Sequence, residues 1–231
     1  MLLTERTVIA RRAALALREG AVVTFGAGLP EAVAAVAGED GILGRIGSTV
    51  GHDAAADAAI GGPTRSESCG TGGLDQAFLD MAEVDRRGNV NVGRFGATTA
   101  GAGGGIDIGR SATCVYFLGT FVSGGQRIRI ADGALEIERE GTRRKFVDKV
   151  RHLTFNGVCA TERGQQVFYV TERAVFRLTG TGLELIEIAP GVQVEKHIFR
   201  SMAFEPRIAP NLRLMDGRIF RTERMVPGGM A

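Results

Sequence analysis

Glycine and small polar residues follow two apolar stretches near the start of the chain. Thr24 to Gly28 overlaps the end of a predicted strand at 21–25, and Val50 to Asp53 begins where a second predicted strand at 46–50 ends. Glycines such as Gly26 let backbone N–H groups approach a ligand closely. Because ligands of open α/β sheets bind beyond the carboxyl ends of parallel strands, both segments are candidate ligand-binding sites.

A third candidate is the glycine-rich segment from Gly101 to Gly105. Five ordered small residues lose much backbone entropy and bury almost no side chain, so packing explains this run poorly. Neither glycine segment fits a nucleotide-binding motif. A dinucleotide fingerprint starting at Gly26 would need glycine where the chain has Glu31, and the glycine-rich segment lacks the lysine of a phosphate loop.

The elements that must position these segments are helices and strands in alternation. Periodicity and capping residues predict helices at 4–20 with Thr4 as the cap, from Pro30 to about Gly38, and at 74–81, 106–112 and 192–202. Residues 51–73 show little periodicity and predict a long loop, and the tail from Arg221 to Ala231 is expected to be frayed.

Short strands separated by turns are typical of the second half of the chain. They are predicted at 89–92, 113–118, 127–130, 135–139, 166–171, 174–178 and 183–188. Hairpin turns are expected at Asp132-Gly133 and at Gly180-Thr181-Gly182. The sequence therefore predicts a single α/β domain spanning 1–231, with a mostly parallel sheet flanked by helices and additional β-hairpins in the second half.

Composition and charge limit the kinds of protein to which this chain can belong. The chain has 231 residues, 44% of them hydrophobic, and a formal net charge of only +2 with mixed signs. This favours a packed core and gives no reason to expect nucleic acid or an anionic membrane as a partner. Cys69, Cys114 and Cys159 form no close pair, which argues against a disulfide framework or a zinc site. We expect a soluble cytoplasmic protein without a bound metal.

Several strings along nearly the whole chain resemble one family, the family I coenzyme A transferases. The similarity is to their C-terminal, catalytic (β-type) half, and it is strongest to the acetate/3-ketoacid and propionate branch. Thr171-Glu172-Arg173-Ala174-Val175-Phe176-Arg177-Leu178 is one such string. The others lie at 8–14, 28–34, 72–79, 88–92, 119–121, 146–147, 184–191 and 214–216.

The resemblance implies an open CoA-transferase fold and a partner. A separate α-type subunit would supply the other half, in a heterodimer or heterotetramer. The implied substrates are an acyl-CoA and a small carboxylic acid, with coenzyme A as part of the substrate and no permanently bound cofactor.

The resemblance also implies roles for particular residues. In the family, a glutamate attacks the thioester, forms an acyl anhydride and then a glutamyl-CoA thioester, beside backbone donors that hold an oxyanion. Gly103 and Gly104 match the donor loop, although Gly105 stands where phenylalanine is usual. In the first glycine turn, Thr24, Gly26 and Gly28 are implied oxyanion- or CoA-binding residues, with Thr24 in place of the usual asparagine. The position of the glutamate falls on Gly51, which cannot form an anhydride.

Several residues could replace the missing glutamate. Glu39 lies in a string similar to the motif of a sister branch, but it is predicted to end a helix on the wrong side of the sheet. Glu67 could act as a nucleophile displaced along the loop. His52, beside Asp53, could serve as a general base for water. Cys69 is a weaker candidate, since a small cysteine is more often buried.

Three functional hypotheses remain. The chain could be a transferase subunit that uses a displaced carboxylate such as Glu67. It could be a CoA-thioester or carbon–carbon bond hydrolase in which Gly51 makes room and His52 or the partner supplies the acid or base. It could also be a non-catalytic subunit that binds coenzyme A or stabilises its partner.

Overall fold

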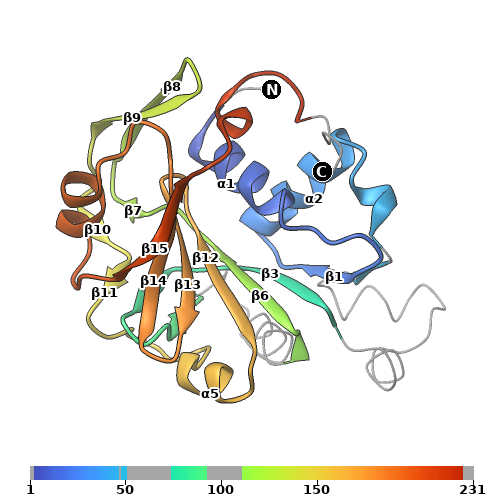
Figure 1. Cartoon of the computed structure of the whole chain (residues 1–231), viewed down its shortest axis with the longest axis horizontal. Coiled ribbons are helices and arrows are strands. Elements are labelled where there is room, and N and C mark those ends of the chain that lie inside the picture. Colours follow the sequence, from blue (N-terminus) through green and yellow to red (C-terminus); the bar gives the residue numbers. More distant parts are fainter. Residues whose placement is uncertain (1–2, 47, 51–73, 93–110, 226–231) are drawn as a thin grey trace.

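A large mixed sheet dominates the computed structural model, which describes residues 3–46, 48–50, 74–92 and 111–225 (Figure 1). The strand order is β15-β14-β13-β12-β6-β3-β1-β2. In chain order these strands are β1 (Val22–Phe25), β2 (Ser48–Val50), β3 (Gln76–Asp80), β6 (Cys114–Leu118), β12 (Gln166–Val170), β13 (Ala174–Thr179), β14 (Gly182–Ile188) and β15 (Arg207–Leu214).

Five neighbouring strands of this sheet run in the same direction. β2, β1, β3, β6 and β12 pair in parallel, whereas β13 is antiparallel to both of its neighbours and β15 is parallel to β14. The predicted mostly parallel α/β sheet is therefore confirmed. Its five parallel strands end at one common edge, which we call the carboxyl edge.

Two helices cover this sheet and pack against each other (Figure 1). Helix α1 (Glu5–Ala14) contacts β6 and β12, and helix α2 (Leu29–Glu39) contacts β1 and β3. The Thr4 side chain accepts a hydrogen bond from the Thr7 N–H, so the predicted cap is confirmed. Helix α1 ends at Ala14 and not at Gly20, because the N–H groups of Ala16 and Leu17 bond to carbonyls three residues earlier.

The prediction of a helix at 74–81 is wrong, because β3 occupies this stretch. Its residues from Gln76 to Leu79 are all buried, and the strand pairs with β1 on one side and β6 on the other. A parallel strand buried on both faces shows a continuous apolar run without period-two alternation. Such a run cannot be distinguished from a short buried helix by periodicity alone.

Smaller strand pairs and two hairpins accompany the parallel strands. β4 (Glu83–Asp85), β5 (Val90–Asn91) and β11 (Phe146–Val147) form one small sheet, and β7 (Val122–Ser123) pairs with β10 (Arg143–Arg144). β8 (Arg127–Ala131) and β9 (Ala134–Arg139) form the predicted hairpin at Asp132-Gly133, and β13 and β14 form the predicted hairpin at 180–182. Both hairpin predictions are confirmed.

Several elements differ from expectation. The predicted helix at 192–202 is two short irregular turns, η3 (Val194–Ile198) and η4 (Phe199–Ser201). Two elements were not predicted from the sequence: helix α5 (Gly157–Glu162), which Asn156 caps, and the edge strand β15, which contains a proline. The remaining short turns are η1 (Leu43–Arg45) and η5 (Gly217–Phe220).

Residues 221–225, the start of the tail that was expected to be frayed, are held in place by contacts with the rest of the chain. Arg11 donates hydrogen bonds to the carbonyls of Arg221 and Glu223, and Met225 is only 2% exposed. Residues 221–225 are therefore packed against α1, and the frayed-tail prediction is wrong for this stretch. The predicted loop at 51–73 and almost all of the predicted helix at 106–112 lie outside the described residues.

Candidate active site

The carboxyl edge brings together residues from segments far apart in the sequence. In the sheet register, Asp80 of β3 pairs with Leu118 of β6, and Leu118 pairs with Val170 of β12. The chain continues past this level into Met81, into 119–121 and into 171–174. Polar side chains after these strand ends therefore lie in one region, as expected for the ligand-binding edge of an open α/β sheet.

The first glycine turn lies at this edge, after β1. Thr24 is buried, and the Gly26 N–H donates to the Phe78 carbonyl at 2.8 Å, so that N–H is already used within the sheet. Gly28 precedes α2 with a φ of 89°, which favours glycine, and its carbonyl accepts a hydrogen bond from Arg6 at 2.6 Å. Close packing and a left-handed turn thus explain both glycines.

Asp80, the last residue of β3, carries a carboxyl group that is largely withdrawn from water. Burial raises the pKa of Asp80 to about 6, while Lys145, the Met81 amide and Arg6 act in the opposite direction. A carboxyl group with this pKa is mostly ionised at neutral pH and exchanges its proton close to neutrality. Such a group can act as a nucleophile or as a general acid and base.

Lys145 approaches the same region from the segment between β10 and β11. Its ammonium donates to the Met81 carbonyl at 3.3 Å, and the parallel pairing of β11 with β4 fixes its backbone. Burial lowers the pKa of Lys145, while the negative charges of Asp80 and Glu172 oppose the shift. The carboxyl edge therefore holds a partly desolvated acid beside a partly desolvated base.

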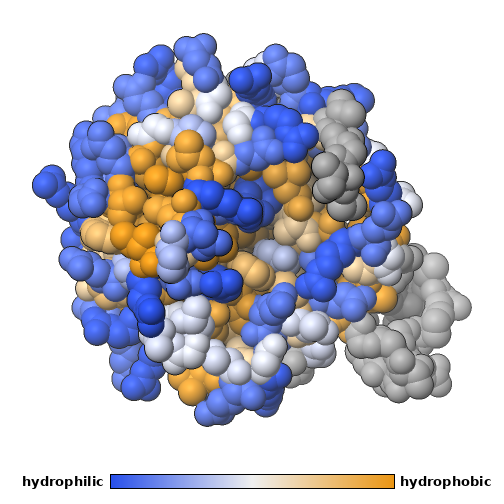
Figure 2. Space-filling view, in the orientation of Figure 1, coloured by the Kyte–Doolittle hydropathy of each residue, from blue (hydrophilic) through white to orange (hydrophobic). Residues whose placement is uncertain are grey.

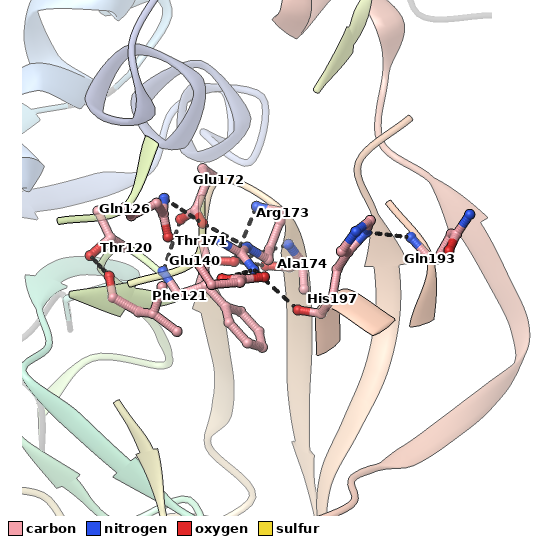
Figure 3. Close-up of polar contacts among 11 residues, drawn as sticks. Thr120, Phe121, Gln126, Glu140, Thr171, Glu172, Arg173, Ala174, Gln193 and His197 are labelled. Carbon is pink, nitrogen blue, oxygen red and sulfur yellow. Dashed lines mark hydrogen bonds and ion pairs between the residues drawn. The ribbon is translucent and has the colours of Figure 1, made fainter. Parts of the chain in front are cut away.

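A second polar group at this edge is centred on Glu172 and Arg173, in the turn between β12 and β13 (Figure 3). The side chains of these two residues are fully buried. Arg173 donates to Glu172 at 2.9 Å, to Glu140 at 2.8 Å and to Gln126 at 2.7 Å, and its guanidinium lies 5.0 Å from the centre of the Phe121 ring. Glu172 accepts hydrogen bonds from the Phe121 N–H and from Gln126. We call these five residues the Arg173 network.

His197 joins this network through its backbone. Its carbonyl accepts from Arg173 at 3.1 Å, and its Nδ1 accepts from the Gln193 N–H at 3.0 Å (Figure 3). Burial lowers the pKa of His197, and the positive charges of Lys196 and Arg173 act in the same direction. A neutral imidazole that accepts at Nδ1 fits a structural role.

The structure tests the placement of some sequence-derived candidates. Thr24, Gly26 and Gly28 lie together at the carboxyl edge, whereas Glu39 ends α2, which leads away from that edge between two parallel strands. Glu39 therefore lies on the opposite side of the sheet, as expected. The remaining candidates lie outside the described residues: Gly51, His52, Asp53, Glu67, Cys69, Gly103, Gly104 and Gly105.

Sequence reasoning assigned no role to Asp80, Lys145 or the Arg173 network. Asp80 was missed because its stretch was predicted as a helix, which hid the fact that it ends a strand. Glu172 and Arg173 were within a string of family resemblance, which was a usable signal. Lys145 had no local signal, since only the packing of the small sheet brings it to the edge.

The described part of the chain contains neither a cluster of metal-ligating side chains nor a helix that could span a membrane. No group of three or more histidine, cysteine, aspartate or glutamate residues in this part of the chain could hold a metal ion. Among the helices that the structure describes, none is long and apolar enough to cross a membrane.

Comparisons with known proteins point to one family, although no protein-family model matches the sequence. The acetate CoA-transferase YdiF of Escherichia coli O157:H7 is 40% identical over 233 residues, which cover 94% of this chain and 44% of YdiF. Caffeate CoA-transferase of Acetobacterium woodii is 37% identical over 238 residues, covering 94% of this chain and 45% of that protein. The chain thus spans about half the length of these curated relatives.

Solved structures agree with the sequence comparisons. The YdiF apoenzyme superimposes with a TM-score of 0.85 at 38% identity, over 99% of this chain and 47% of that one. Glutaconate CoA-transferase of Acidaminococcus fermentans shares the fold, with a TM-score of 0.65 at 17% identity over 97% of this chain and 95% of that one. This chain is therefore a homologue of about half of a family I CoA-transferase, and it has the fold of that family.

Proposed function

We propose that this chain is the β-type part of a CoA-transferase and that it moves coenzyme A between an acyl-CoA and a small carboxylic acid. The observation that carries the proposal is the 40% identity to an acetate CoA-transferase across 94% of the chain. The carboxyl edge adds support, because a partly buried carboxyl group lies there beside Lys145 and Arg6. Carboxylate chemistry on a thioester needs an ionised acid in such surroundings.

An α-type partner is part of the proposal. The chain covers 44% of YdiF, and in this proposal the α-type partner is the counterpart of the remaining part. Apolar surface near β15 supports a partner: Ile208 is 46% and Leu214 is 61% exposed on this edge strand, and Figure 2 shows apolar residues at the surface there. Covering such residues removes apolar area from water.

Hydrolysis is the second candidate function. Glycine at position 51, where the resemblance places the attacking glutamate, is the observation that favours it. In this reaction water takes the place of the acceptor acid, and His52 acts as its general base. A thioester or a carbon–carbon bond of a CoA-linked substrate would then be cleaved.

Isotope exchange in the native complex tests the proposal. The chain is purified from its host with its bound partners, and the complex is incubated with acetyl-CoA and isotopically labelled acetate. Transfer predicts that label enters acetyl-CoA without net loss of the thioester. Release of free coenzyme A without incorporation of label would instead establish the hydrolase. A complex that does neither would contradict both catalytic functions. The hypothesis of a non-catalytic subunit would then remain.

A further inference from the structure

The transferase reaction needs a carboxylate that can reach a thioester, and the acids of the described region differ in that respect. Glu172 has a side chain with no exposed surface, and both of its oxygens accept hydrogen bonds. Glu83 is bonded to Asn91 and to the backbone of Arg151. Neither can approach a substrate without breaking existing contacts.

Asp80 meets the requirement. It is the last residue of β3 at the carboxyl edge and remains partly exposed. β3 pairs directly with β1, so Asp80 lies near the glycine turn that follows β1, and Arg6 links the two sites by bonding the Gly28 carbonyl. No carboxylate in the described part of the chain combines this position with partial exposure and a desolvated environment.

The charged groups around Asp80 are suited to a reacting carboxylate. Lys145, which donates a hydrogen bond to the carbonyl of Met81 next to Asp80, and Arg6 of α1 both act on Asp80 through their positive charges. The negative charge of Glu172 acts in turn on Lys145. The two cations favour the ionised acid, whereas burial makes that ion more basic than an ordinary surface carboxylate. An ion of this kind is a better nucleophile toward a carbonyl carbon than a fully hydrated one.

We propose that Asp80 is the carboxylate of this chain that attacks the acyl-CoA thioester, with Lys145 and Arg6 as positioning residues. The inference rests on the proposed transferase function. A carboxylate oxygen of Asp80 bonds to the thioester carbonyl carbon, and the carbon–sulfur bond breaks, which releases coenzyme A as a thiolate and leaves a mixed anhydride. The thiolate then attacks the aspartyl carbonyl, which expels the acyl group as a carboxylate and leaves an aspartyl-CoA thioester. The acceptor acid reverses both steps.

Chemical trapping locates the reacting residue. The native complex is incubated with acetyl-CoA, treated with borohydride, digested and analysed by mass spectrometry, while label exchange with acetate is measured on the same preparation. The proposal predicts reduction of residue 80 to a primary alcohol, dependent on acetyl-CoA. A reduced residue elsewhere, such as Glu67, would overturn the assignment and leave the transferase function standing. Absence of label exchange would overturn the transferase function, and the assignment with it.

A matched pair of variants gives an independent test. Asp80→Asn keeps the shape of the side chain but cannot form an anhydride, so exchange should fall on the order of 10³-fold or more. Asp148→Asn removes an exposed acid beyond β11 and should exchange at the wild-type rate. The thermal unfolding of both variants is measured to show that they are folded. An Asp80→Asn complex within tenfold of the wild-type rate would refute the proposal.

Discussion

Two polar groups at the same edge of the sheet are built in opposite ways. The Arg173 network has a fully buried centre, the Glu172–Arg173 ion pair, and its guanidinium makes hydrogen bonds to three side chains and one carbonyl. Asp80 and Lys145 are only partly buried, and both have shifted pKa values. The first group has its charges satisfied by partners, whereas the second retains charges that burial disfavours.

This difference separates a structural role from a chemical one. A buried ion pair with complete hydrogen bonding resists change, because removing one partner strands the other away from water. A desolvated acid and base with few hydrogen-bond partners are reactive instead, because each can form a bond to another group. We therefore expect mutations in the Arg173 network to affect stability and mutations around Asp80 to affect reactivity and pH dependence.

The largest expected effect on stability is at Arg173. Arg173→Met leaves the Glu172 carboxylate buried without its guanidinium partner, which should cost about 3–5 kcal/mol of unfolding free energy. Urea denaturation measures the loss. The double variant Glu172→Gln/Arg173→Met should recover part of the stability because no buried charge is stranded. A loss below about 1 kcal/mol in the single variant would show that the network is not structural.

Lys145 should control the pH at which the acid of this pair ionises. Its positive charge lowers the pKa of Asp80, so Lys145→Met should raise that pKa further above about 6. The acidic limb of the pH–rate profile for acetate exchange should then move to higher pH. Lys149→Met removes an exposed lysine four residues away and should leave the profile in place. Identical profiles in both variants would contradict the pairing of Asp80 with Lys145.

A smaller effect is expected on stability at Asp80 itself. Its pKa is higher in the folded protein than the ordinary value of 3.8, so this carboxyl group stabilises the fold at low pH and loses that contribution as the pH rises through about 6. Asp80→Asn should therefore be more stable than wild type at pH 8 by about 1–2 kcal/mol, with little difference at pH 4. Thermal unfolding at the two pH values checks this. If the stabilities of the variant and the wild type differed by the same amount at pH 4 and at pH 8, Asp80 would not be a desolvated acid.

The smallest effect should come from an exposed ion pair. Arg86 and Asp148 are 3.1 Å apart, with side chains 61% and 69% exposed. Asp148→Asn should change the unfolding free energy by less than about 1 kcal/mol, because water and salt screen such pairs. A larger change, measured by urea denaturation, would mean that exposure is a poor guide to which polar contacts matter in this fold.

Local sequence patterns were sufficient to predict elements that are determined by neighbouring residues. The hairpin between β8 and β9 was predicted from Asp132-Gly133, and β6 from its continuous apolar residues. β3 was predicted as a helix because a strand buried on both faces carries no alternation. Because of this error, Asp80 was not recognised as the last residue of a strand.

The candidate site could be predicted only in part, because most of its contacts join distant segments. The glycine turn after β1 was found from its own residues. The burial of Arg173, by contrast, depends on Phe121, Gln126, Glu140 and the backbone of His197, which come from separate segments. Lys145 reaches the edge through pairing between β11 and β4, about sixty positions apart, and no local pattern reports such pairing.

The distinction between a fixed network and a reactive acid is tested most directly by titrating the Asp80 carboxyl group in the folded chain. Carbon-13 NMR of aspartate-labelled protein, with Asp80→Asn to assign the resonance, measures this pKa without any need for a substrate. We predict a pKa of about 6. A value near 3.8 would contradict the account, because Asp80 would then be an ordinary hydrated surface acid.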